Sequence, residues 1–192
     1  MGPERDYAAT AEILLDSGSK VESRREDGKT ALHIAAEEGD RELVAILLAR
    51  GADVSSRTPI GDTPLHLAAL GKSSWGAWAR KVRAATGSVP DYRETAKLLI
   101  AHGAAVDAAN GARGTPLYFA AVVCNREVAE VLLAHGADVA ARSLHGETLL
   151  MGALRGHGET WGWTRMSENE AIERGECYDR MIEWLKEHGA KE

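Results

Sequence analysis

The chain has 192 residues, with 23 Lys or Arg against 29 Asp or Glu, and a formal net charge of −6. Nucleic acids and anionic membranes attract clustered cations, and the sequence has no Lys/Arg block, so neither is expected as a partner. No segment approaches the roughly 18 apolar residues of a membrane-spanning helix. Cys124 and Cys177 lie 53 residues apart without a CxxC pair, which predicts reduced thiols, no zinc site and a cytoplasmic location.

Residues 7–17 form the first predicted helix, and a tetrapeptide then recurs along the chain. Its four copies, the last one degenerate, are Thr30-Ala31-Leu32-His33, Thr63-Pro64-Leu65-His66, Thr115-Pro116-Leu117-Tyr118 and Thr148-Leu149-Leu150-Met151. Each copy starts 12 residues after a glycine that closes an apolar helix; these are Gly18, Gly51, Gly103 and Gly136. A fixed spacing of this kind predicts one supersecondary unit that is stacked several times.

The first full unit, residues 25–57, indicates why each copy has to be stacked. A turn at Gly28 precedes Thr30, which is predicted to cap a short helix running to Ala36. A second helix with a broad apolar face follows and ends at Gly51. Neither short helix can bury its apolar face alone, so neighbouring units have to cover it.

These residues strongly resemble the ankyrin repeat family. The matching stretches of the first unit are Gly28–Ala36 and Leu47–Val54, and residues 61–69 repeat the first of them. The resemblance covers nearly everything from Tyr7 to Ala190. It implies an all-α solenoid of stacked helix pairs with hairpin-like fingers, whose concave face, made of fingers and first helices, usually binds proteins.

The whole chain is predicted to be a single array. Its parts are an N-terminal half-repeat cap (7–24), repeat 1 (25–57), repeat 2 (58–109, with an insertion at 72–90), repeat 3 (110–142) and repeat 4 (143–192, with an insertion at 157–176). Either a lone helix caps the N-terminal end, or an upstream half-repeat is missing. The charge of Lys186 in the last helix suits a terminal helix facing water, so the array is expected to end at Glu192.

The two insertions resemble each other. In each, a tyrosine follows a Trp-Gly pair at a distance of 17 residues from the Trp: Tyr92 after Trp75, and Tyr178 after Trp161. This likeness suggests that a short-plus-long repeat pair was duplicated. Each insertion is also predicted to contain a helix, the first ended by Gly87 and the second, opened by a capping box at Ser167, ended by Gly175.

The histidines are predicted to be mainly structural. By the family resemblance, His33 and His66 tie neighbouring turns together. A second set, His102, His135 and His188, precedes the glycine that ends each helix, where a cation is favourable beside the helix C-terminus. These three recur once per unit and would form a row rather than a metal site. His145 and His157 are less constrained and could contact a ligand, and no cofactor or metal is expected.

Two functions remain open from the sequence. The first is a non-catalytic module, expected to be monomeric, that binds a partner protein through finger and first-helix residues: Arg24, Glu26, Asp27, Lys29, Glu37, Glu38, Arg57, Ile60, Asp62, Arg142, Leu144, His145 and Glu147. The second is a small-molecule binder or enzyme in which the insertions fold over repeat 3. Its aromatic pocket would comprise Trp75, Trp78, Tyr92, Tyr118, Val122, Val123, Trp161, Trp163 and Tyr178, with Arg80, Arg165 and His157 as further polar groups.

The sequence favours the first function, because no catalytic residue, nucleophile signature or phosphate-binding loop is recognisable. A third reading, a purely structural piece of a larger polypeptide, also remains open. In the first reading, exposed apolar residues would supply the anchors of the interface: Ile60, Leu144, Val122 and Val123.

Overall fold

The computed structural model describes residues 7–71, 90–158 and 168–191. Within these ranges the secondary structure is helical apart from turns and one isolated β-bridge between Arg24 and Thr30. The helices are α1 (Tyr7–Asp16), α2 (Ala31–Glu38), α3 (Arg41–Ala49), α4 (Pro64–Leu70), α6 (Tyr92–Ala101), α7 (Pro116–Val122), α8 (Arg126–Ala134), α9 (Leu149–Gly158) and α10 (Glu168–Glu187).

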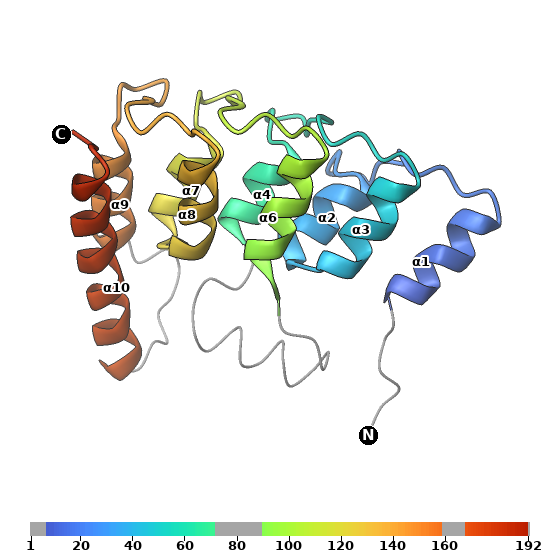
Figure 1. Cartoon of the computed structure of the whole chain (residues 1–192), viewed down its shortest axis with the longest axis horizontal. Coiled ribbons are helices and arrows are strands. Elements are labelled where there is room, and N and C mark those ends of the chain that lie inside the picture. The colour runs from blue at the N-terminus through green and yellow to red at the C-terminus, as the bar shows by residue number, and fades with distance from the viewer. Residues whose placement is uncertain (1–6, 72–89, 159–167, 192) are drawn as a thin grey trace.

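The helices stand in a row of pairs (Figure 1). The pairs are α2 with α3, α4 with α6, α7 with α8, and α9 with α10, while α1 packs against α3. The first helix of each pair contacts the first helix of the next, from α2 through α4 and α7 to α9. The predicted all-α solenoid of stacked pairs is therefore confirmed, and the extended turns between pairs form fingers along one edge of the row (Figure 1).

Each second helix of the first three pairs begins at a side-chain cap. The carboxylate oxygens of Asp40 and Asp91 each accept a hydrogen bond from the backbone N–H three residues on, at 3.0 Å. Asn125 makes the equivalent bond at 3.3 Å. Such a cap satisfies one of the free N–H groups of a helix start and stabilises it by about 1 kcal/mol.

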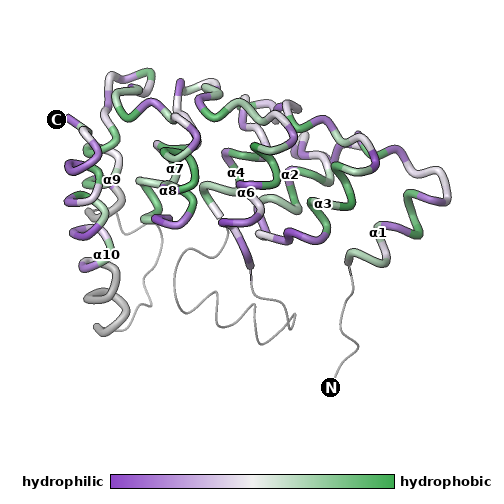
Figure 2. Tube along the Cα trace, in the orientation of Figure 1, coloured by the Kyte–Doolittle hydropathy of each residue, from purple (hydrophilic) through white to green (hydrophobic). Residues whose placement is uncertain are grey.

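The core runs along the row between the two layers of helices. The leucine two residues after the motif threonine is buried in the first three pairs, as Leu32, Leu65 and Leu117, each with 0 % exposure. Small alanines beside it let adjacent first helices approach closely, as at Ala35, Ala68 and Ala120. In Figure 2 hydrophobic colour recurs in the helices along the row, including α3, α7 and α8. Burial of each leucine contributes about 2 kcal/mol.

The prediction of reduced cysteines is wrong. Cys124 and Cys177 form a disulfide, with Cα atoms 6.4 Å apart, which joins the turn between α7 and α8 to α10. Cys124 has a φ of 56°, in the left-handed region that favours glycine, and Gly39 occupies the same turn of the first pair with a φ of 68°. The spacing of 53 residues concealed the pairing because stacking alone brings α10 against the end of α7.

The predicted helix stop at Gly175 is also wrong, since α10 continues through it from Glu168 to Glu187. A single glycine costs a helix only about 1 kcal/mol, and the packing of α10 against α9 outweighs that cost. The helix predicted for the first insertion and its stop at Gly87 lie outside the described residues. The same holds for Trp75, Trp78, Trp161 and Trp163.

Candidate functional site

Arginines hold adjacent fingers together. The guanidinium of Arg24 donates to the carbonyl of Gly28 in its own finger and to that of Arg57 in the next, both at 2.8 Å. Arg57 repeats the arrangement, donating to Gly61 at 2.9 Å and to Ala109 at 2.8 Å. Arg24 and Arg57, both predicted to contact a partner, therefore also position the fingers, and their contact with a partner stays a prediction. Arg142 donates to Gly146 within its own finger at 2.8 Å.

A buried histidine links the first helix of each of the first two pairs to the following finger, as predicted. His33 Nδ1 accepts from the backbone N–H of Thr30 at 3.2 Å, and its Nε2 donates to the carbonyl of Asp62 at 3.1 Å. His66 does the same with Thr63 and Gly114, both at 3.1 Å. Burial lowers the pKa of both imidazoles, so they are held in the neutral form.

The histidines that precede the helix-ending glycines are tied to their own helices. In His102, His135 and His188 the Nδ1 atom lies 2.7–2.9 Å from the carbonyl four residues earlier. They occur once in each of the last three pairs, and each is bonded to its own helix, which agrees with the structural role predicted for them. Among the described residues no group of three or more His, Cys, Asp or Glu side chains could hold a metal ion.

A groove lies between the fingers and first helices of the first two pairs. Its volume is about 390 Å³, and its lining is Asp27, Lys29, Glu37, Thr58, Pro59, Ile60, Asp62, Leu67 and Leu70. Five of these nine residues belong to the predicted partner-binding set, so stacking brings together residues that are up to 35 positions apart. Ile60 is 67 % exposed, an unusual state for so apolar a side chain.

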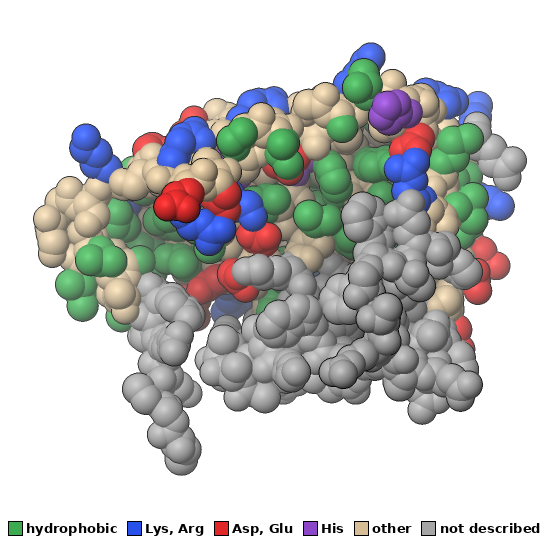
Figure 3. Space-filling model, turned by 180° about the vertical axis from the view of Figure 1, so that it is seen from behind, with side chains coloured by type: hydrophobic (Ala, Val, Ile, Leu, Met, Phe, Trp, Pro, Cys, Tyr) green, Lys and Arg blue, Asp and Glu red, His purple; other side chains and the backbone are tan. Residues whose placement is uncertain are grey.

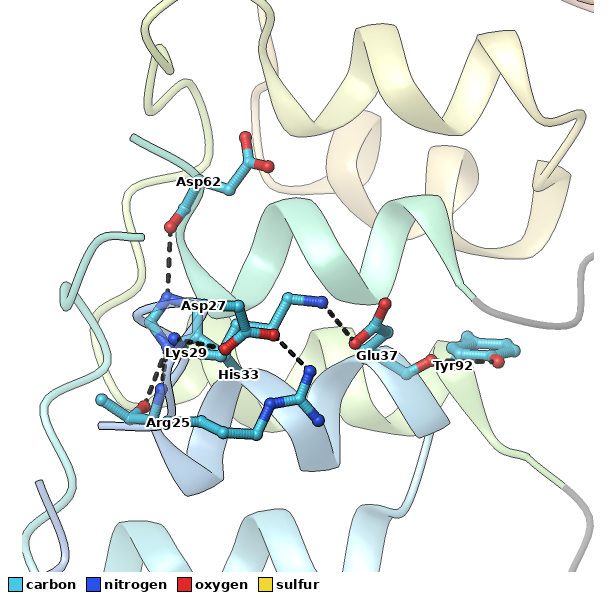
Figure 4. Close-up of polar contacts among 8 residues, drawn as sticks. Arg25, Asp27, Lys29, His33, Glu37, Asp62 and Tyr92 are labelled. Carbon is cyan, nitrogen blue, oxygen red and sulfur yellow. Dashed lines mark hydrogen bonds and ion pairs between the residues drawn. The ribbon is translucent and has the colours of Figure 1, made fainter. Parts of the chain in front are cut away.

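Charged side chains form one side of this groove (Figure 4). The ammonium of Lys29 lies 2.7 Å from a carboxylate oxygen of Glu37, and both side chains are about one-fifth exposed. Asp27 accepts a hydrogen bond from the guanidinium of Arg25, and this bond lowers the pKa of its carboxyl group. The carboxyl group of Asp27 is therefore ionised at neutral pH.

Asp62 lines the base of the groove and is only 6 % exposed. Its carboxylate accepts from the side-chain amide of Asn110 at 2.8 Å, while its backbone carbonyl accepts from His33. This predicted contact residue therefore joins the second finger to the third. Glu26 and Glu38 lie outside the groove lining; Glu26 is exposed and Glu38 is half-buried.

A second ion pair occupies the equivalent positions of the fourth pair, with its polarity reversed. Glu147 and Arg155 stand one residue before and seven residues after the motif threonine, as Lys29 and Glu37 do, and they form an ion pair. Glu147 also accepts from the hydroxyl of Tyr118 at 2.7 Å. Arg155 was not predicted as a site residue, although its position in the repeat matches that of Glu37.

Between the two ion pairs the face made by the first helices is apolar. Leu70 and Val122 are half-buried there, at the positions that Glu37 and Arg155 hold in the outer pairs. Figure 3 shows the molecule from behind, with hydrophobic side chains along the middle of the row and charged ones towards both of its ends. Leu144, a finger residue of the fourth pair, is 58 % exposed, and its neighbour His145 is also exposed.

Of the described members of the predicted aromatic pocket, Tyr118, Val122 and Tyr178 meet at α7, whereas Tyr92 lies at the end of α2. Tyr92 donates to the carbonyl of Glu37 at 3.3 Å, and Tyr178, wholly buried in the core, donates to that of Val122 at 2.5 Å. Glu37 and Val122 are equivalent positions, so both tyrosines cover the end of the preceding first helix. Val122 and Val123 are half-buried rather than exposed. His157 lies in α9.

The part of the chain that the structure describes contains no helix long and apolar enough to cross a membrane. A family model described as ankyrin repeats (three copies) matches residues 4–77. A second model, described as ankyrin repeat, matches residues 60–111 and 114–144. None of the curated proteins matches this chain.

Proposed function

The chain belongs to the ankyrin repeat family, and we propose that it is a non-catalytic module that holds a partner protein against its fingers and first helices. Members of this family are typically protein–protein interaction modules. The observation that carries the proposal is the groove between the first two fingers, with the exposed side chain of Ile60 at its rim. Exposed apolar side chains beside charged groups are typical anchors of protein interfaces.

The other exposed apolar finger residue, Leu144, would be a second anchor at the opposite end of the row. The charged residues near each anchor would set the orientation and association rate of the partner more than its affinity. These are Asp27, Lys29, Glu37 and Glu38 at one end, and Arg142, His145 and Glu147 at the other. Monomeric behaviour and the aromatic pocket both stay predictions, the latter because its tryptophans lie outside the described residues.

The test uses two isoleucines of equal exposure. Ile60 is 67 % exposed beside the groove, and Ile13 is 66 % exposed on α1. Partners are captured from the native host on the intact chain and identified by mass spectrometry, in parallel with the Ile60→Asp and Ile13→Asp variants. A genuine partner should be lost with Ile60→Asp, since a buried carboxylate replaces an apolar anchor, and retained with Ile13→Asp.

Thermal melting of both variants checks that the fold persists, because each side chain is largely exposed and should change the melting temperature little. If every captured protein responds equally to the two substitutions, or to neither, the proposed surface is wrong.

For the compartment, we propose an oxidising one instead of the cytoplasm predicted from the cysteine spacing. The disulfide between Cys124 and Cys177 supports this choice. Cytosolic thiols are kept reduced by glutathione and thioredoxin, whereas disulfides persist in secreted and periplasmic proteins.

A further inference from the structure

We propose that the groove between the first two fingers takes a partner segment in which an apolar side chain stands next to a Lys or Arg. This inference rests on the proposed function and adds the chemistry of the segment that is recognised. It follows from the apolar floor of the groove and from the sign of the charge along its wall.

The floor and one rim of the groove are apolar. Leu67 is 3 % exposed and forms the bottom, Leu70 is half-buried beside it, and Pro59 and Ile60 are exposed at the edge. The volume of about 390 Å³ is at the low end of the roughly 300–1,000 Å³ usual for ligand pockets. A groove of this size and depth suits one or two side chains of a peptide rather than a whole folded element.

The charged wall is negative. The lining contains three carboxylates, those of Asp27, Glu37 and Asp62, against the single ammonium of Lys29. Lys29 is already paired with Glu37, and Asp62 is held by Asn110. Asp27 is paired with Arg25, whose side chain is 63 % exposed and thus well hydrated. A cation that enters beside the apolar floor is attracted by this wall, and an anion is repelled.

Two of the carboxylates can still be reached. The side chain of Asp27 is 34 % exposed and that of Glu37 is 18 % exposed. A guanidinium or ammonium attached one or two positions from an apolar anchor can therefore approach the wall while the anchor occupies the floor. Arg is favoured over Lys because its planar guanidinium can donate two parallel hydrogen bonds to a carboxylate.

The experiment selects phage-displayed random dodecapeptides on the intact chain. The expected result is enrichment of peptides in which Lys or Arg stands within two positions of a large apolar residue. One enriched peptide is then synthesised, and its Kd is measured for the wild type, for the double variant Asp27→Asn with Glu37→Gln, and for Glu127→Gln. The control Glu127 is an exposed carboxylate of α8, outside the groove lining.

The double variant should weaken binding about tenfold at low salt and reduce its dependence on ionic strength, because partly desolvated charge pairs are lost. The control should stay within about twofold of the wild type. Loss of the ion pair between Lys29 and Glu37 could lower the melting temperature of the double variant. In that case Asp27→Asn alone, at an exposed position, is used for the test. It should also weaken peptide binding, but by less than the double variant.

The inference would be overturned by enriched peptides that lack a basic residue. It would also be overturned by peptides whose Kd is the same for the wild type and the carboxylate variants. If such peptides still require Ile60, the proposed function stands and only the chemistry of the partner is wrong. Selection without any enriched peptide also overturns the inference, since the groove then takes no linear segment, and the capture experiment with Ile60→Asp decides the proposed function separately.

Discussion

At the scale of the residue, the side chain at one position of the repeat makes different contacts in different units. The third residue after the motif threonine is His33, His66, Tyr118 or Met151. Two of these are buried imidazoles that hold the next finger through a backbone carbonyl, whereas Tyr118 extends further and reaches the Glu147 side chain. The repeat pattern therefore predicts where a link between units stands, but the side chain decides which atom it reaches.

The buried imidazoles predict that stability depends on pH. Their pKa values are lowered by burial, so between the folded pKa and the unfolded value of about 6.5 the unfolded chain binds more protons. The free energy of unfolding should thus be highest with respect to these two groups above about pH 7, and it should fall as the pH drops below 6.5. The slope is at most about 1.4 kcal/mol per pH unit for each imidazole.

Urea unfolding between pH 5.5 and 7.5 measures this slope. A double variant, His33→Gln with His66→Gln, should be less stable at neutral pH, yet its stability should depend less on pH. A variant slope as steep as that of the wild type would mean that other groups control the response to acid.

At the scale of the element, the turn between the two helices of the first pair and that of the third pair each receive a tyrosine from the second helix of the next pair. Tyr92 of α6 packs against Gly39 and reaches the carbonyl of Glu37. Tyr178 of α10 reaches the equivalent carbonyl of Val122, close to Cys124. The likeness of the two insertions, noticed as a shared Trp-to-Tyr spacing, thus corresponds to one shared contact in the structure.

The disulfide should stabilise this second turn. A cross-link spanning 53 residues is worth up to about 4 kcal/mol in the chain-entropy model, so Cys124→Ser with Cys177→Ser should lower the melting temperature markedly. Cys124 also has a positive φ, which costs a non-glycine residue about 1 kcal/mol. Hence Cys124→Gly with Cys177→Ser should be more stable than the double serine variant.

Calorimetry of the three proteins, together with the wild type under reducing conditions, compares these stabilities. If reduction and both double variants leave the melting temperature unchanged, the cross-link contributes nothing to the fold.

At the scale of the whole molecule, contacts are made between neighbours in the row, and the two layers share one continuous core. Such arrays are stabilised unit by unit, so stability should vary along the row. The interior helices are covered on both sides: α4 lies between α2 and α7, and α7 lies between α4 and α9. In contrast, α1 leaves Ile13 and Leu14 more than half exposed.

Hydrogen exchange of the native protein should therefore show a gradient. Backbone amides of α1 should exchange at least about tenfold faster than those of α7, because opening α1 exposes little buried surface. Equal protection of the two helices would indicate that the array opens only as one cooperative unit.

The sequence by itself determined the stacked-pair fold, the order of the units and the structural role of His33 and His66. These features depend on a local period, so the residues that specify them lie within one unit and recur in the next. The interrupted period also predicts two insertions, and their bounds stay predictions. Residues 168–176, predicted as part of the second insertion, lie in α10.

Only the tertiary structure decided the groove and the disulfide. The groove is lined by residues of two consecutive units, Lys29 and Glu37 of one and Pro59, Ile60 and Leu67 of the next. No short sequence pattern predicts a contact between two fingers. The cysteines meet because α10 packs against α9 and reaches the end of α7, and the same packing carries the helix through Gly175. Contacts of this kind depend on how rigid elements are placed against one another, and that placement is a property of the stacked molecule.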